Sequence, residues 1–255
     1  AEKTKKNYED SFSDTSIKDL VKKHKKKSSY IDIETRIFSG CIQSLNIKLG
    51  DIYVGIVEGL LESSSEFELH PLSGKYIKRN ISDESDLLIE NYVKKRIQER
   101  GKVPNEDFQN LLLLINENEP TTDTVDAQYD VDLLFQSVTG DKLYYFEAKL
   151  TDDHDTGKYE ELNGRIFKTY GYLNNALSES ERKNLQPGLV FWKDIEKPRP
   201  VYFLPEIYYG SNFFETFLGL DISDIDVIMN DLAQHYAPFI KEKYHQIVVD
   251  QKYTV

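Results

Sequence analysis

The alternation of apolar and polar positions is clearest between Tyr129 and Lys149, where the sequence reads YDVDLLFQSVTGDKLYYFEAK. Two apolar, aromatic-rich runs at 131–135 and 143–146 are separated by the pair Gly140-Asp141, which favours a turn. Aromatic and β-branched residues bounded by turn residues are typical of strands. The pattern therefore predicts two β-strands joined by a short turn.

Three charged residues, Asp132, Glu147 and Lys149, interrupt this apolar hairpin. Glu147 and Lys149 are two positions apart, so on a strand they point to the same face, which Asp132 can reach from the neighbouring strand. Two carboxylates can bind a hard cation such as Mg²⁺, and a lysine can neutralise charge and orient or deprotonate a water. The pattern predicts metal-assisted phosphodiester hydrolysis. The alternative is a solvated Glu-Lys ion pair on an edge strand, against which the preceding aromatic run argues.

Elsewhere, apolar residues recur mostly at helical spacing, with a few short runs typical of strands. A strand at 189–193 follows a predicted helix, so it should pair in parallel with a hairpin strand. The remaining elements that we expect are a helical pair within 31–62 interrupted at Gly50-Asp51, helices over 82–100, 105–116 and 159–177, strands at 67–69 and 201–204, and a last helix capped by Ser223.

This order of elements predicts an α/β fold, with a central mixed β-sheet flanked by helices on both faces and helical N-terminal additions. We expect a single domain over residues 1–255. Within it, a mainly helical part at 1–120 precedes a core sheet at 121–205 that carries the catalytic residues, and a C-terminal helical part follows at 206–255.

Composition narrows the class of protein. No apolar run approaches the roughly 20 residues of a membrane span, and the first residues lack the apolar segment of a secretory signal. The single cysteine, Cys41, forms no internal disulfide and no zinc cluster, which favours a reducing cytoplasm.

The net charge is −12, and many acidic residues lie in and around the hairpin. We therefore expect weak DNA binding until a divalent cation is present.

The charged residues of the hairpin also carry a family resemblance. Asp132, followed fifteen positions later by Glu147-Ala148-Lys149, resembles the signature of the PD-(D/E)XK nuclease superfamily, best known from type II restriction endonucleases. Val131 stands where the signature has proline. Asp130 is a competing choice for the first aspartate, and Asp132 is preferred because an apolar strand follows it directly.

The resemblance implies a restriction endonuclease-like core and Mg²⁺-dependent cleavage of double-stranded DNA at a specific sequence, leaving 5′-phosphate and 3′-hydroxyl ends. Asp132, Glu147 and the Ala148 carbonyl would hold Mg²⁺, and Lys149 would position the attacking water. In this superfamily an early helix often supplies a further acidic ligand, for which Glu58 is the first choice here and Glu90 the alternative. Palindromic sites and cleavage of two strands imply a homodimer.

The segment after Lys149 supplies candidates for DNA contacts. Lys158 can reach a phosphate, and Arg165 and Lys168 share one face of the predicted helix, although an ordinary amphipathic helix has the same pattern. His154 is a general-base candidate, with a solvated loop histidine as the alternative. Two other classes stay open: a repair, recombination or RNA-processing nuclease of the same fold, and a non-catalytic binding module.

Overall fold

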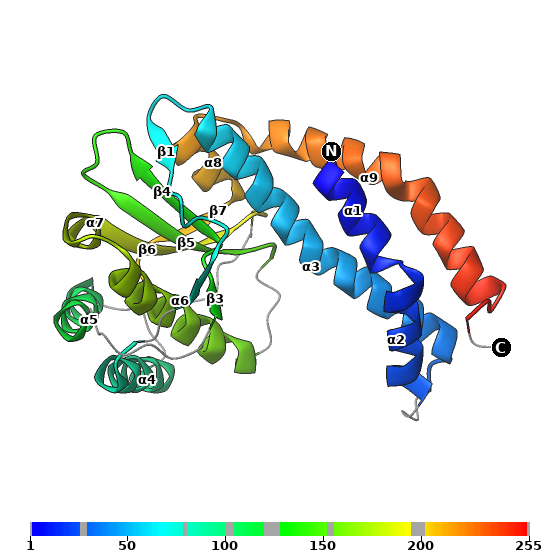
Figure 1. Ribbon diagram of the computed structural model, residues 1–255, viewed down its shortest axis with the longest axis horizontal. Coiled ribbons are helices and arrows are strands. Elements are labelled where there is room, and N and C mark those ends of the chain that lie inside the picture. Colours follow the sequence, from blue (N-terminus) through cyan, green and yellow to red (C-terminus); the bar gives the residue numbers. More distant parts are fainter. Residues whose placement is uncertain are drawn as a thin grey trace. The chain divides into compact units, whose positions relative to one another are not determined.

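The computed structural model describes residues 2–25, 30–78, 81–99, 105–119, 128–151, 156–194 and 202–253 (Figure 1). The chain forms two compact units, of which one contains residues 1–55 and 220–255 and the other residues 56–219. The single nuclease domain expected from the sequence stays a prediction.

A five-stranded mixed sheet organises the second unit, with the strand order β1-β4-β5-β6-β7. The first three strands pair antiparallel, and β6 and β7 continue the sheet in parallel to β5. The predicted hairpin and the predicted parallel strand are thereby confirmed. The strands are β1 (Phe67–Leu69), β4 (Leu133–Ser137), β5 (Leu143–Lys149), β6 (Leu185–Phe191) and β7 (Ile207–Tyr209), and a separate pair joins β2 (Tyr76–Lys78) to β3 (Gln128–Asp130).

Helices cover both faces of this sheet, which confirms the predicted α/β class. Figure 1 shows α4, α5 and α6 on one side of the sheet and α8 on the other. Their bounds are α4 (Asp83–Glu99), α5 (Asn105–Asn118), α6 (Thr156–Ala176) and α8 (Gly210–Leu218), with the short α7 (Glu179–Asn184) leading from α6 into β6.

The register of the hairpin decides which side chains face which helices. Leu134 lies opposite Tyr145, and both belong to the core formed with α6. Phe135 and Phe146 point to the other face, where the ring of Phe146 meets that of Phe213 from α8 at 5.4 Å. Because side chains alternate along a strand, the residues at 145, 147 and 149 all lie on the α6 face.

The first unit is helical, as the predicted N-terminal additions require. Its elements are α1 (Glu2–Ser11), α2 (Asp14–Lys25), the first part of α3 (Ile33–Glu62), α9 (Ile222–Tyr244) and the π-helical turn η1 (His245–Val249). Its core includes Phe12, Ile17, Ile37, Cys41 and Ile247. None of the helices in the described ranges combines the length and the apolar character that a bilayer span requires.

Two helix predictions were wrong in detail. The helical pair at 31–62 is one continuous helix, α3, because Gly50 costs a helix only about 1 kcal/mol, and buried residues such as Leu45 and Ile52 lie on both sides of it. The last helix is capped by Asp221, which accepts a hydrogen bond of 2.8 Å from the Ser223 N–H.

The predicted strand at 201–204 was also wrong, since the described residues 202–204 form no strand. The backbone N–H of Phe203 donates instead to the side-chain oxygen of Asn163 on α6, at 2.8 Å. The apolar character of this segment reflects burial against α6, where Tyr202, Phe203 and Leu204 join the core. The strand at this edge of the sheet, next to β6, is β7, which begins at Ile207.

Candidate active site

Asp132, Glu147 and Lys149 meet on the α6 face of the sheet. Asp132 directly precedes β4, and the other two residues end β5. The Lys149 ammonium lies 2.5 Å from Oε1 of Glu147 and 3.7 Å from Oδ2 of Asp132. The antiparallel pairing of the two strands is therefore what brings both carboxylates to one cation.

The backbone of Ala148 completes this cluster. Its N–H donates to Oδ2 of Asp132 at 2.9 Å, and its carbonyl accepts from the Lys149 ammonium at 3.0 Å. Asp132, Glu147 and the Ala148 carbonyl thus present oxygen atoms to one positively charged group. Carboxylate and carbonyl oxygens are also the ligands that hard divalent cations bind.

Glu147 is fully buried, with 0% of its residue surface exposed, and both of its carboxylate oxygens are occupied. Oε2 accepts a hydrogen bond of 2.9 Å from the Tyr145 hydroxyl, and Oε1 accepts from Lys149 and lies 3.1 Å from Nε of Arg165. Burial, together with the neighbouring carboxylates, raises the pKa of Tyr145 well above 10, so this phenol stays a donor. The sequence pattern does not single out Tyr145, although its position two residues before Glu147 places it on the same face.

Asp132 has an unusual pKa for an aspartate. Desolvation by burial raises its pKa to about 6, and repulsion from Glu147 adds to this rise. Attraction to Lys149 and Arg165 and the hydrogen bond from Ala148 act in the opposite direction. Its side chain keeps 20% of its surface exposed, so this carboxylate remains accessible from solvent.

The two basic side chains predicted to share a face of α6 have different partners. Arg165 contacts Glu147 and also lies 3.9 Å from Oδ1 of Asp132, with 40% of its side chain exposed. Burial lowers the pKa of Arg165, but attraction to Glu147 and Asp132 outweighs this and raises it. Lys168 pairs with Asp86 of α4 at 2.5 Å, and that acidic partner was not anticipated. Lys158 lies exposed in the first turn of α6.

Comparison with known proteins identifies the family of this chain. The family model described as "Type II restriction endonuclease, HinfI" matches residues 2–234. The chain belongs to the HinfI family of type II restriction endonucleases. A similar protein is the type II restriction enzyme HinfI of Haemophilus influenzae, which is 30% identical over 229 residues, covering 88% of this chain and 86% of that enzyme. No solved structure matches the chain.

Members of the HinfI family are site-specific endodeoxyribonucleases, so this protein is a hydrolase that binds and cuts DNA. Among the residues described, the cluster of Asp132, Glu147 and Lys149 brings together the groups that phosphodiester hydrolysis needs: oxygen ligands for a cation and a base or orienting group for water. It is therefore the candidate active site of this HinfI-family enzyme.

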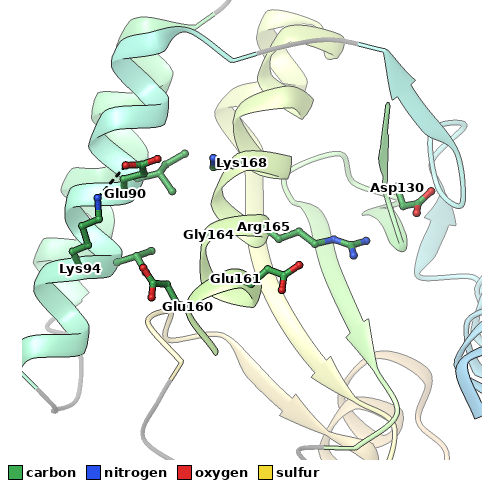
Figure 2. A pocket seen from close by; sticks show the side chains of 10 residues that line it. Glu90, Lys94, Asp130, Glu160, Glu161, Gly164, Arg165 and Lys168 are labelled. Atoms are coloured by element: carbon green, nitrogen blue, oxygen red, sulfur yellow. Dashed lines mark hydrogen bonds and ion pairs between the residues drawn. The ribbon is translucent and has the colours of Figure 1, made fainter. Parts of the chain in front are cut away.

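A cavity of about 510 Å³ lies between α4 and α6 and reaches the cluster at Arg165 (Figure 2). Lys94 and Glu90 form an ion pair of 3.1 Å on its α4 wall. Asp130, the competing choice for the metal aspartate, lines this cavity and acts on Arg165 electrostatically. Four carboxylates and three cations line the cavity, so it is no ready-made site for a phosphate. The charged lining residues are Glu90, Lys94, Asp130, Glu160, Glu161, Arg165 and Lys168.

The further acidic ligand expected from an early helix is not in the cluster. Glu58 lies on α3 and accepts a hydrogen bond of 3.2 Å from the Ser73 hydroxyl. Ser73 in turn accepts from the Leu134 N–H, which ties Glu58 to the strand that follows Asp132. Across the described ranges, no three His, Cys, Asp or Glu side chains are grouped to hold a metal ion. His154 falls outside the residues that the structure describes.

Proposed function

We propose that this HinfI-family enzyme cuts DNA with a PD-(D/E)XK catalytic centre formed by Asp132, Glu147 and Lys149, and that Mg²⁺ is its cofactor. One observation carries the proposal: the Lys149 ammonium lies against the Glu147 carboxylate and the Ala148 carbonyl, beside Asp132. A positive charge is thus already stabilised where the oxygen atoms converge. A solvated surface ion pair would not place a fully buried glutamate at its centre.

The donor set fits Mg²⁺ because it consists of oxygen atoms alone. Proteins commonly bind Mg²⁺ through one or two carboxylates together with waters and substrate phosphates. Asp132, Oε1 of Glu147 and the Ala148 carbonyl would hold it, while DNA supplies the remaining oxygen ligands. When bound, the cation would stabilise charge on the phosphate and lower the pKa of a bound water.

Lys149 and Arg165 would then have different roles in the reaction. Lys149, once its ammonium leaves the carboxylates, would orient the attacking water. After losing a proton to solvent, its neutral amine would accept a proton from that water. Arg165 would exchange its carboxylate partners for the scissile phosphate, whose developing charge a guanidinium stabilises well. In-line attack at phosphorus would leave 5′-phosphate and 3′-hydroxyl ends.

The assembly that we propose is a homodimer acting in the cytoplasm. A type II enzyme reads double-stranded DNA, and two identical subunits related by a two-fold axis match a palindromic site. Each subunit would then cut one strand with its own copy of the cluster. Sedimentation with and without a cleavable duplex tests this assembly directly.

Digestion of a plasmid with Mg²⁺ tests the catalytic assignment. The purified protein should give discrete fragments whose sequenced ends share one recognition site, and Asp132→Ala, Glu147→Ala and Lys149→Ala should each reduce cleavage at least about a hundredfold. Asp130→Ala is the matched control, because it removes the neighbouring aspartate that lies outside the cluster, and it should retain cleavage. A smear of fragments would indicate a nuclease without sequence specificity, and full activity in Glu147→Ala would overturn the proposed centre.

A further inference from the structure

The hydroxyl of Tyr145 is a buried polar group whose role goes beyond the three signature residues. Tyr145 lies in the centre of β5 with 0% of its surface exposed, and it packs in the core between the sheet and α6. Its hydroxyl donates to Oε2 of Glu147 at 2.9 Å. Glu147 is equally buried, so the phenol and the carboxylate form a polar pair that solvent does not reach.

This hydrogen bond gives the two oxygens of Glu147 different surroundings. Oε2 points into the core and is held by Tyr145, whereas Oε1 points to Lys149 and Arg165 at the accessible side of the cluster. A carboxylate with one oxygen fixed in this way has lost its freedom to rotate. Oε1 is therefore directed toward the Lys149 ammonium, which also lies near Asp132 and the Ala148 carbonyl, where a cation would need it.

We infer that Tyr145 is a positioning residue that orients Glu147 for binding a divalent cation through Oε1. The inference rests on the proposed function, since it assigns to Tyr145 a task at the same site. Hydrogen-bonding partners of metal ligands fix ligand orientation, and their removal typically weakens metal affinity or activity 10- to 100-fold. Tyr145 suits this task because its ring is fixed by the core and its hydroxyl donates directly to Oε2 of Glu147.

The substitution Tyr145→Phe removes only the hydroxyl and leaves the ring in the core. Tyr170→Phe is a matched control, because the buried Tyr170 on α6 also donates its hydroxyl to a side-chain oxygen, that of Asn116 at 2.8 Å, but lies outside the cluster. Both variants lose one tyrosine hydroxyl from the same core. Near-ultraviolet circular dichroism and thermal unfolding should show that both variants fold.

Binding of Mn²⁺ to the full-length protein without DNA, followed by electron paramagnetic resonance, is the decisive measurement. We expect the dissociation constant to rise about 10-fold or more in Tyr145→Phe and to stay unchanged in Tyr170→Phe. In cleavage assays, the Mg²⁺ concentration for half-maximal rate should rise in Tyr145→Phe, and higher Mg²⁺ should restore much of the rate. A purely structural role for Tyr145 would change thermal stability without moving either metal titration.

Measuring Glu147→Ala alongside these variants distinguishes a failure of the inference on Tyr145 from a failure of the proposed catalytic centre. If Glu147→Ala abolishes Mn²⁺ binding and cleavage while Tyr145→Phe binds Mn²⁺ like the unmodified protein, the inference on Tyr145 fails and the proposed centre stands. If Glu147→Ala binds Mn²⁺ and cuts DNA normally, the proposed centre itself fails.

Discussion

The Nζ atom of Lys149 lies 2.5 Å from Oε1 of Glu147, and the same ammonium reaches the carbonyl of Ala148. A side-chain cation therefore occupies the place among the oxygen atoms where we propose that Mg²⁺ binds. Because both positive charges would need the same oxygens, Mg²⁺ at the proposed site would have to displace the ammonium. The displaced lysine would then lie beside the substrate, where it can act on water.

Lys149→Ala should separate metal binding from chemistry. Loss of the ammonium should lower the single-turnover cleavage rate at saturating Mg²⁺ by about 10²- to 10⁴-fold, the range for a group that takes part in proton transfer. Mn²⁺ binding without DNA should persist or become tighter, since a competing cation is gone. Lys142→Ala is the control, because this exposed lysine lies just before the opposite end of β5. Cleavage by Lys149→Ala at the unmodified rate would contradict the role of Lys149.

Arg165→Gln should have opposite effects on metal and on DNA. Arg165 competes for Oε1 of Glu147 from a half-exposed position, and such a pair contributes no more than about 1 kcal/mol. The Mn²⁺ dissociation constant without DNA should therefore fall by no more than about fivefold, while cleavage falls about tenfold or more, because a guanidinium no longer stabilises the phosphate.

Calorimetric Mn²⁺ titration and single-turnover cleavage measure these two effects of Arg165→Gln. Arg182→Gln is the control, because Arg182 lies on α7, just before β6 begins. This substitution should change neither quantity. If Arg165→Gln weakened metal binding instead, Arg165 would be a support for the carboxylates and not a competitor of the cation.

The part of the site that follows from local geometry could be predicted from the sequence. Asp132, Glu147 and Lys149 lie on adjacent strands of one hairpin, so the two-residue period of a strand and the register are enough to bring them together. Tyr145 obeys the same rule. Its role at the site was not predicted, because aromatic residues are common in apolar strands. Only the hydrogen bond to Glu147 distinguishes Tyr145 from them.

The features that could not be predicted depend on contacts between residues far apart in the chain. The DNA contact of Lys168 stays a prediction, and its ion-pair partner Asp86, which was not predicted, comes from a helix in another part of the sequence. Phe203 lies in an apolar run typical of a strand, yet its N–H bonds to the side chain of Asn163, 40 positions away. Local pattern carries no information about such partners, because tertiary contacts override propensity.

The raised pKa of Asp132 should make stability depend on pH in the absence of divalent cations. In the folded protein the Asp132 carboxyl group stays protonated up to about pH 6, whereas the ordinary pKa of an aspartate is 3.8. Between these values the folded state binds more protons than the unfolded state, so the free energy of unfolding falls as pH rises. Above pH 7 the ionised Asp132 should cost about 2 kcal/mol, allowing for its partial exposure.

Asp132→Asn removes this titration and keeps an oxygen that can accept from the Ala148 N–H. In buffer with a chelator, urea unfolding should show the variant to be more stable than the unmodified protein at pH 8, with the difference vanishing near pH 4. Asp130→Asn, at an exposed position, should leave the profile unchanged. Parallel profiles for Asp132→Asn and the unmodified protein would rule out the raised pKa.

Gly188 allows β6 to approach β5, and this approach supports the catalytic strand. In the parallel pairing Gly188 lies opposite Phe146, and a Cβ atom at this position would overlap the Phe146 ring, coming within 2.6 Å of its Cδ1. The ring has little room to yield, because its centroid lies 5.5 Å from that of Tyr208 and 5.4 Å from that of Phe213. Gly188→Ala should therefore destabilise the protein by about 1–3 kcal/mol, as overpacking of a core does.

Gly188→Ala should also disturb the active site, because a displaced Phe146 ring moves β5 and Phe146 directly precedes Glu147. We expect the cleavage rate of Gly188→Ala to fall under conditions where the protein is still fully folded. Gly59→Ala is the matched control, because Gly59 is exposed on α3 with no atom within 4 Å of an added Cβ. That change should stabilise the protein by about 0.4–1 kcal/mol and leave cleavage unaltered. Urea unfolding gives both stabilities, and equal midpoints for the two variants would show that Gly188 is not needed for close packing of the two strands.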